Sequence, residues 1–383
     1  MGVWVHTGSR DETADQAGIS HFVEHMVFKG TKKRRMHQIA NRLESVGGYL
    51  NAFTSKEHTC FHARALDTDL DRAIDTTCDL VKSPVFPERE LEREKTVVLE
   101  EMKMYEDAPE EHIFDRFESV IFPDHPIGRP VIGYANTVSS LTRQDLVHFV
   151  NGRYTPNRIV VAAAGNVRHE HLVKHVEKAF DGLRAAQNAR TVNVSASYEP
   201  GEIVEARPIQ QAHLVVGQRG ISVGSNRQAS LGILNTLLGG GMSSRLVQNI
   251  REKYGFCYNV FSFANLHSDC GDFGVYIGTD ATKVRRAQRL VFRELDRLAQ
   301  NPVSSRALAR AKSQVKGGIV MGLESMNNRM IRLATQELMV GRLISLDEAM
   351  AELDAVTVED VQNLAQDLLK PDLFSRVLIL PES

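Results

Sequence analysis

His21-Phe22-Val23-Glu24-His25 is the stretch of this 383-residue chain that carries the most information. On an α-helix, residues three and four positions apart lie on one face, so the two histidines and the glutamate can converge on one point. The apolar residues around them recur at helical spacing, and Gly30 can end the helix. Two imidazoles and a carboxylate that converge in this way suit Zn²⁺ with a bound water.

The order of these residues, H-x-x-E-H, is that of the inverted zinc-peptidase motif. A short match has an alternative interpretation, which is a half-buried helix with two incidental histidines. A third ligand distinguishes the two interpretations, because a catalytic zinc usually has three protein ligands and one open position.

The candidate third ligands lie on a single helix that we predict over residues 88–119, where carboxylates are frequent. Most of them are expected on a solvated face, but Glu94 and Glu101 share one face with Val98. Glu94 and Glu101 are about 10 Å apart along a straight helix. Zinc ligands sit about 2 Å from the metal, so only one of the two glutamates can bind it directly. The other could orient a ligand.

The composition limits the class of protein. Lys and Arg number 46 and Asp and Glu 48, which argues against a general nucleic-acid binder. No apolar run is long enough for a membrane-spanning helix, and the first residues do not resemble a signal peptide. The cysteines form no CxxC pair, so we expect reduced core residues in a cytoplasmic, bacterial-like compartment or an organelle matrix: Cys60, Cys78, Cys257 and Cys270.

Two echoes along the chain indicate a duplicated domain. Thr142 begins a pattern of amphipathic helix, proline and strand that returns, with the same spacing, at Thr357. Residues 48–53 are echoed by residues 255–261 in the same order. Chance similarity between amphipathic helices explains one echo better than two.

The echoes predict two homologous α+β domains, each a mainly antiparallel sheet packed with long helices. We expect a first domain over 1–190, a linker over 191–205 that lacks periodicity, and a second domain over 206–383. Candidate strands and helices follow from the patterns of apolar residues: strands 49–54, 158–164, 213–217 and 273–279, and helices 37–46, 69–82, 88–119, 284–299 and 305–324.

The chain resembles the pitrilysin/insulinase-type zinc peptidases, and most closely the bacterial processing proteases and the catalytic subunit of the mitochondrial processing peptidase. Four stretches carry the resemblance, which runs from Val3 to near the C-terminus: residues 8–12, 18–31, 47–54 and 92–101. Members of that family usually begin with an earlier strand, so the resemblance implies that the first domain lacks its N-terminal strand.

The resemblance implies a zinc endopeptidase with one Zn²⁺ per chain, held by His21, His25 and Glu101. Glu24 would be the general base that activates the water. Glu94 matches a glutamate close to the metal that does not bind it directly. The helical-face argument agrees with this assignment, because it allows only one of the two glutamates to be a ligand.

The second half contains no H-x-x-E-H. Arg251 and Tyr258 resemble the family's pair that reaches the active site from the far side of a chamber and stabilises the oxyanion. An arginine on a helix and a tyrosine at a strand start are also common without such a role.

Residues 50–54 resemble the family's edge strand, which pairs with extended substrate: Leu50, Asn51, Ala52 and Phe53 would bind peptide backbone. Glu111 and Asp115 align with an acidic pair that binds an arginine upstream of the cut. A plain sheet strand and a solvated helix face are the alternatives.

Enzymes of this family enclose their substrate between two two-domain halves, and this chain supplies one half. The resemblance therefore implies a second copy, as a homodimer, or a homologous non-catalytic subunit, with Arg251 and Tyr258 serving the partner's zinc site. The alternative function is a non-catalytic scaffold or binding subunit of a processing or respiratory complex. Such subunits usually have broken metal motifs, and the motif is complete here.

Overall fold

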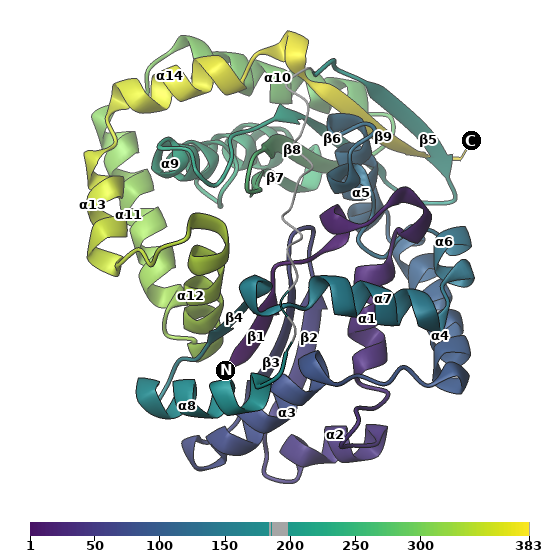
Figure 1. The fold of residues 1–383 in the computed structure, drawn as a ribbon. Helices are drawn as coiled ribbons and strands as arrows, with labels where there is room; N and C mark the ends of the chain where they lie inside the picture. The colour runs from purple at the N-terminus through teal and green to yellow at the C-terminus, as the bar shows by residue number, and fades with distance from the viewer. Residues whose placement is uncertain (184, 186–197, 383) are drawn as a thin grey trace. The chain divides into compact units, whose positions relative to one another are not determined.

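A computed structural model describes residues 1–183, 185 and 198–382, which form two compact units (Figure 1). The first unit consists of Met1–Met104, His125–Val192 and Leu323–Gly341, and the second of Tyr105–Asp124, Asn193–Gly322 and Arg342–Ser383. Neither unit is a continuous stretch of chain. Both differ from the predicted ranges 1–190 and 206–383, because residues 105–124 belong to the second unit and residues 323–341 to the first. Residues 191–197 of the predicted linker lie outside the described residues.

The sheet of the first unit is antiparallel throughout, with the strand order β2-β3-β1-β4. Its strands are β1 (Gly2–Val5), β2 (Tyr49–Thr54), β3 (Thr59–Arg64) and β4 (Ile159–Ala162). Side chains alternate between the two faces of a strand. Val3 and Val5 accordingly join the core that contains the helix of residues 19–27, and Trp4 packs on the opposite face with Met330 and Ala334.

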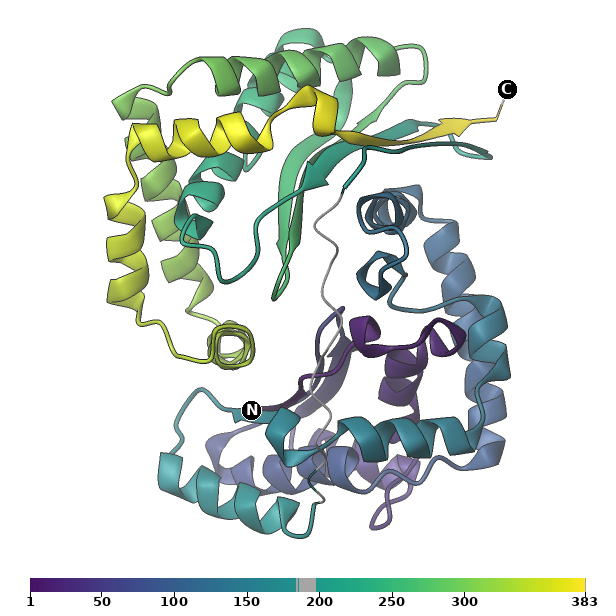
Figure 2. The same cartoon turned by 45° about the horizontal axis from the view of Figure 1, so that its top comes forward.

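The helices of the first unit cover both faces of this sheet (Figure 2). Met330 and Ala334 belong to α12 (Met326–Val340), which comes from the second half of the sequence and packs on β4. The other helices of this unit are α1 (Ile19–Val27), α2 (Met36–Glu44), α3 (Leu70–Lys82), α4 (Glu88–Glu106), α6 (Ala135–Ser140), α7 (Arg143–Arg153) and α8 (His169–Phe180).

The sheet of the second unit has the order β5-β9-β6-β8-β7, and only the pair β5 and β9 is parallel. Its strands are β5 (Glu202–Arg207), β6 (Ala212–Arg219), β7 (Cys257–Leu266), β8 (Gly271–Thr279) and β9 (Ser375–Pro381). Its helices are α5 (Pro109–Ile121), α9 (Gln228–Leu238), α10 (Val284–Gln300), α11 (Ser305–Gly322), α13 (Leu346–Ala355) and α14 (Val358–Leu368). The predicted α+β class with mainly antiparallel sheets is confirmed.

Both sequence echoes fall on equivalent elements of the two units. Thr142 and Thr357 are the N-caps of α7 and α14, and each accepts a hydrogen bond from the amide of the aspartate three residues later. A capping box of this kind fixes where a helix begins. Each of these helices leads through a proline-started 3-10 turn into a strand: β4, which pairs with β1, or β9, which pairs with β6. The other echo falls on the edge strands β2 and β7.

The prediction of a single helix over residues 88–119 is wrong. α4 ends at Glu106, and α5 starts at Pro109, where proline occupies the first helical turn. A residue before proline is pushed away from the helical region, and Ala108 accordingly adopts φ −102° and ψ 88°. The break separates the acidic helix that carries Glu101 from the helix that carries Glu111 and places the latter in the second unit.

The remaining fold-level observations concern cysteines and membrane spans. The four cysteines are free, as predicted, and Cys60, Cys78 and Cys270 are buried whereas Cys257 is half-buried. None of the helices in the described part of the chain combines the length and apolar content that a bilayer crossing requires.

Candidate metal centre

The helix α1 presents its polar side chains to one side because its apolar residues fix the other side in the core. Ile19, Phe22 and Val23 are fully buried, and His21 and His25 are left on the half-exposed face. The helix starts at Gly18, whose φ of 95° lies in the left-handed region. A Cβ there would lie 2.5 Å from the carbonyl oxygen of Ile132, so glycine is required at this turn.

A buried glutamate holds the start of α1. The two carboxylate oxygens of Glu12 accept hydrogen bonds from the backbone amides of Gly18 and Ser20, each at 2.7 Å. These amides have no partner within the helix, so the carboxylate satisfies them. Burial raises the pKa of Glu12 to about 7, although the hydrogen bonds from Ser20 and Gly18 act in the opposite direction. Glu12 thereby fixes the position of the helix that carries the histidines.

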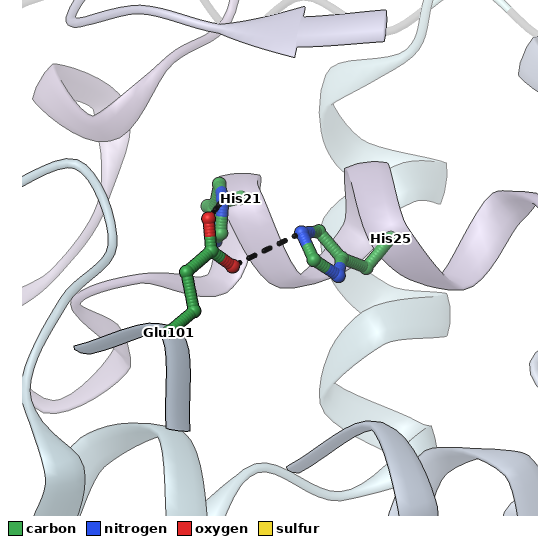
Figure 3. A group of neighbouring side chains, drawn as sticks. All are labelled: His21, His25 and Glu101. Atoms are coloured by element: carbon green, nitrogen blue, oxygen red, sulfur yellow. Dashed lines mark ion pairs between the residues drawn. The ribbon is translucent and has the colours of Figure 1, made fainter. Parts of the chain in front are cut away.

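His21 and His25 of α1 meet Glu101 of α4 (Figure 3). Nε2 of His21 lies 3.9 Å from Oε1 of Glu101, and Nε2 of His25 lies 3.6 Å from Oε2. One ligand atom from each of the three residues lies within 4.8 Å of the others. Atoms bound about 2 Å from one ion stand roughly 3 to 4 Å apart, so the three side chains fit a divalent metal such as zinc with little rearrangement.

Glu94 lies on the other side of His25. Its Oε1 is 2.9 Å from Nδ1 of His25, and its Oε2 is 2.6 Å from Nζ of Lys29. Burial acts to raise the pKa of Glu94, but the hydrogen bonds to His25 and Lys29 outweigh it and lower the pKa. The ionised carboxylate accepts the Nδ1 proton, which leaves the lone pair on Nε2, the atom that faces Glu101. This is how a carboxylate orients a metal-binding histidine.

The two histidines differ in their protonation. Burial, with a contribution from the neighbouring His25, lowers the pKa of His21 to about 3, so its imidazole is neutral. Burial also acts to lower the pKa of His25, but the hydrogen bond that it donates to Glu94 and the charges of Glu101, Glu94 and Glu24 raise it. A metal binds the neutral imidazole and therefore competes with a proton only at His25 near neutral pH.

Glu24 lies on the same helix face beside these groups. Burial raises its pKa, and the charge of Glu101 adds to this, whereas a hydrogen bond from Thr54 opposes it. The Thr54 hydroxyl donates to Oε2 of Glu24 at 2.5 Å. A half-buried carboxylate with a raised pKa, fixed beside a metal site, is suited to accept a proton from water.

Thr54 ends β2, the edge strand that the sequence suggested for substrate binding. The predicted residues Leu50 to Phe53 lie on this strand, whose other edge pairs with β3. Asn51 is exposed, and its side-chain oxygen accepts the backbone amide of Ala52 at 2.9 Å. β2 therefore places in the same unit as Glu24 a sheet edge that no described strand pairs with, and Thr54 is the direct link between them.

Arg251 and Tyr258 lie in the second unit and contact each other. The guanidinium carbon of Arg251 is 5.3 Å from the ring centre of Tyr258, within cation–π range. Arg251 belongs to a π-helical turn, Val247–Glu252, and Tyr258 lies where the register of β7 shifts by one residue. π-helical turns and β-bulges both occur frequently at functional sites. Tyr258 is 82% exposed, which is unusual for a large aromatic ring.

Glu111 and Asp115 belong to α5 of the second unit, whereas His21, His25 and Glu101 belong to the first unit. The apolar face of α5 holds it against the sheet, where Phe114 packs against Phe263 at 5.1 Å between ring centres. Glu111 is exposed and Asp115 half-buried. The helical spacing of the pair is as predicted, one turn apart on the same helix.

Three contacts of this site escaped the sequence argument. Lys29 follows His25 by four residues, so helical spacing could have predicted that it lies beside Glu94, the partner of His25. Glu12 belongs to a stretch that carried the resemblance, but its role depends on the fold. The contact of Thr54 with Glu24 joins two elements that are separate in sequence, so no local pattern predicts it.

Two family models match consecutive parts of the chain. The family model described as insulinase (peptidase family M16) matches residues 1–134, and the model described as peptidase M16 inactive domain matches residues 140–315. The first match contains all three candidate ligands. The second covers the half of the chain in which the sequence has no H-x-x-E-H.

Several bacterial relatives are similar over nearly the whole chain. An uncharacterized zinc protease of Streptomyces coelicolor is 40% identical over 380 residues, which is 96% of this chain and 82% of the relative. An uncharacterized zinc protease of Bacillus subtilis is 38% identical, covering 100% of this chain and 92% of the relative. Another, of Mycobacterium tuberculosis, is 41% identical, covering 99% and 87%.

Two solved structures share the fold. A protease from Helicobacter pylori superposes with a TM-score of 0.93 at 22% identity, covering 99% of this chain and 93% of that one. A peptidase M16 inactive domain from Pseudomonas fluorescens gives a TM-score of 0.91 at 22% identity, covering 100% and 92%. At this identity the likeness concerns the fold alone.

Proposed function

Because the chain belongs to the insulinase family of peptidases, peptidase family M16, we propose that it is a zinc metalloendopeptidase that hydrolyses unfolded peptides or presequences. The observation that carries the proposal is the convergence of His21, His25 and Glu101, with Glu24 beside them on the same helix. A scaffold or binding subunit of a processing or respiratory complex is the alternative, and it gives no reason for a complete metal-binding set.

The residues divide the work of hydrolysis between them. His21, His25 and Glu101 would hold Zn²⁺, which supplies a Lewis acid that polarises the scissile carbonyl and acidifies water. Glu24 accepts the proton of the attacking water and delivers it to the leaving amine. The hydrogen bond from Thr54 restricts the rotation of the Glu24 carboxylate, so the base is oriented before substrate arrives. Glu94 holds the ring of His25 with Nε2 directed to the metal.

Substrate would bind along the free edge of β2. An extended peptide that adds a strand there makes backbone hydrogen bonds, which tolerate many side chains. The strand ends at Thr54, and this residue contacts the base, so a peptide paired with residues 50–53 runs towards Glu24. This supports a preference for unfolded segments. Glu111 and Asp115 would add a preference for an arginine upstream of the cut through paired carboxylates.

A second chain would complete the enclosure of substrate. We propose a homodimer or a complex with a homologous non-catalytic subunit, in which Arg251 and Tyr258 serve the partner's zinc site. The cation–π contact of this pair at a π-helical turn and a β-bulge supports a functional role, because a guanidinium and a phenol held together can donate to one developing oxyanion.

The test compares the wild type with Glu24→Gln, a change that keeps the shape of the side chain but removes the base. The expected results are zinc bound by both proteins and a loss of hydrolysis of a quenched basic peptide of about 10²- to 10⁴-fold in the variant. Glu92→Gln is the matched control, because Glu92 lies on the solvent side of α4 and pairs only with Lys95 among the described contacts. Equal activity of wild type and Glu24→Gln would overturn the proposal.

A further inference from the structure

A second group of metal-binding side chains lies in the first unit, away from the centre described above. It consists of His171 and His175 on α8 and Asp71 on α3. One ligand atom from each of these residues lies within 4.8 Å of the other two. The two helices lie side by side, as Figure 1 shows, and pack against each other. The group thus bridges two elements that are about a hundred residues apart in sequence.

The geometry of this group repeats that of the proposed zinc centre. His171 and His175 are four residues apart on one helix, with ring centres 4.1 Å apart. Oδ1 of Asp71 is 2.5 Å from Nε2 of His171, and Oδ2 is 3.7 Å from Nε2 of His175. A single carboxylate therefore faces both imidazoles, each through its Nε2 atom. The 3.7 Å separation is that of ligands around one ion, whereas the 2.5 Å contact is a hydrogen bond that a bound ion would replace.

The backbone sets the tautomer of one histidine. Nδ1 of His175 lies 2.8 Å from the carbonyl oxygen of His171, which can only accept a hydrogen bond. Nδ1 therefore carries the proton, and the lone pair of the neutral ring is on Nε2, which faces Asp71. A histidine that binds a metal through one nitrogen commonly donates from the other to a carbonyl in this way.

The surroundings allow a hydrated cation to enter. The side chains are partly open to solvent, with exposed fractions of 32% for His171, 34% for His175 and 59% for Asp71. A shallow cavity of about 300 Å³ adjoins His171 and Asp71 and is also lined by Asp67 and Asn166. A proton shared between His171 and Asp71 is the alternative occupant. Such a proton neutralises the Asp71 carboxylate, but it gives no role to the imidazole of His175, whose Nε2 faces the same carboxylate.

We propose that Asp71, His171 and His175 form a second divalent-metal site, selective for ions such as Zn²⁺ that favour imidazole, and that the ion cross-links α3 to α8. The site is not catalytic. Its helix reads His171-Leu172-Val173-Lys174-His175, so a lysine stands where α1 carries Glu24. An ammonium group cannot accept a proton from water, and it does not add to the negative charge around the ion.

The test counts zinc in the full-length protein, freed of metal and dialysed against buffered Zn²⁺. The wild type is expected to bind two ions per chain at saturation, and His171→Ala/His175→Ala one. His169→Ala is the matched control, since it removes an exposed histidine of the same helix that is outside the group, and it should still bind two. Asp71→Asn, which keeps the side-chain shape, should weaken the second binding step.

A second measurement reports on the cross-link without using activity. In a His25→Ala background, which disables the first centre, Zn²⁺ should raise the melting temperature of the chain, because it ties two helices of one core together. The further change His171→Ala/His175→Ala should abolish that rise. The proposal is overturned if the wild type binds a single ion at saturation, or if removing both α8 histidines changes neither the count nor the zinc-dependent rise.

Discussion

The first unit contains two groups built to the same plan: two histidines one turn apart on a helix and a carboxylate from a second helix. They differ in what surrounds the ligands. His21 and His25 are 13% and 22% exposed, whereas His171 and His175 are 32% and 34% exposed. Glu24 stands between the first pair, and Lys174 occupies the same place in the second.

This difference separates metal binding from catalysis. Three ligand atoms with suitable spacing are enough to hold an ion, and both groups provide them. Hydrolysis needs in addition a proton acceptor beside the ion, a fixed orientation for that acceptor and a place for substrate. Within the described part of the chain, only the group on α1 has a carboxylate between its histidines, a hydroxyl that donates to that carboxylate and an adjacent edge strand.

The largest effect is expected from removal of a ligand of the first group. His25→Ala should abolish hydrolysis. The variant, loaded with one equivalent of zinc, should also lose the ion, because the two ligands that remain cannot hold it against a competing chelator. Zinc content after brief dialysis against a chelator and peptide cleavage measure the two effects. The control variant His169→Ala, on α8, should retain both peptide cleavage and the bound zinc. Full activity of His25→Ala would contradict the assignment of catalysis to the group on α1.

Glu94→Gln should have the next largest effect, a reduction of zinc affinity by about 10- to 100-fold. The amide still contacts His25 but no longer carries the charge that holds the ring in its metal-binding orientation and raises its basicity. Competition with a chromophoric chelator measures the change, with Glu92→Gln as the control. An unchanged affinity would mean that Glu94 does not orient His25.

Zinc affinity of the first group should depend on pH mainly through His25. Its pKa is raised, because the hydrogen bond to Glu94 and nearby carboxylate charges outweigh burial, whereas that of His21 is lowered to about 3. Zinc binds the neutral ring, so affinity should fall about tenfold per pH unit once the pH drops below the raised pKa. In Glu94→Gln the fall should begin at a lower pH. If the decline of zinc affinity with falling pH showed that two protons compete with the ion, that result would contradict the neutral state of His21.

Thr54→Val should have a smaller effect, concentrated at low pH. The hydroxyl stabilises ionised Glu24, so its loss should raise the pKa of that carboxylate further. The acid limb of the pH–rate profile should then move to higher pH, with a loss of activity of about a few fold at neutral pH. Thr54→Ser retains the donor and should behave as the wild type. Identical profiles for Thr54→Val and Thr54→Ser would exclude this role.

The smallest effect is expected from the change that makes the two groups most alike. Lys174→Glu turns α8 into a second H-x-x-E-H, yet in a His25→Ala background it should give no measurable hydrolysis. The new glutamate would lack an orienting donor such as Thr54 and the β2 edge for substrate. Peptide cleavage above the His25→Ala background would show that the motif alone is sufficient.

Much of the first centre could be predicted from the sequence, because its parts are local. Helical spacing places His21, Glu24 and His25 on one face, and it reduces the third ligand to Glu94 or Glu101. In the structure, Nε2 of both histidines faces Glu101. The exchange of α5 and α12 between the units follows from packing between distant segments, which no local pattern contains.

The second group shows a mixed case. The spacing of His171 and His175 was visible in the sequence, but the two histidines lacked a partner there, since Asp71 joins them only when α3 packs against α8. The helix break before Pro109 was likewise visible, and the strong acidic pattern on both sides of it obscured the signal. Contacts such as Thr54 with Glu24 depend on the register of a strand against a helix, which the sequence does not specify.

The most direct test of the account is the location of zinc at one equivalent per chain, by anomalous diffraction at the zinc edge from crystals of the full-length protein. We expect the strongest anomalous peak within bonding distance of His21 Nε2, His25 Nε2 and the Glu101 carboxylate, with Glu24 beside it and not bound to it. A strongest peak at His171 and His175, or anywhere else, with none between His21, His25 and Glu101, would contradict it.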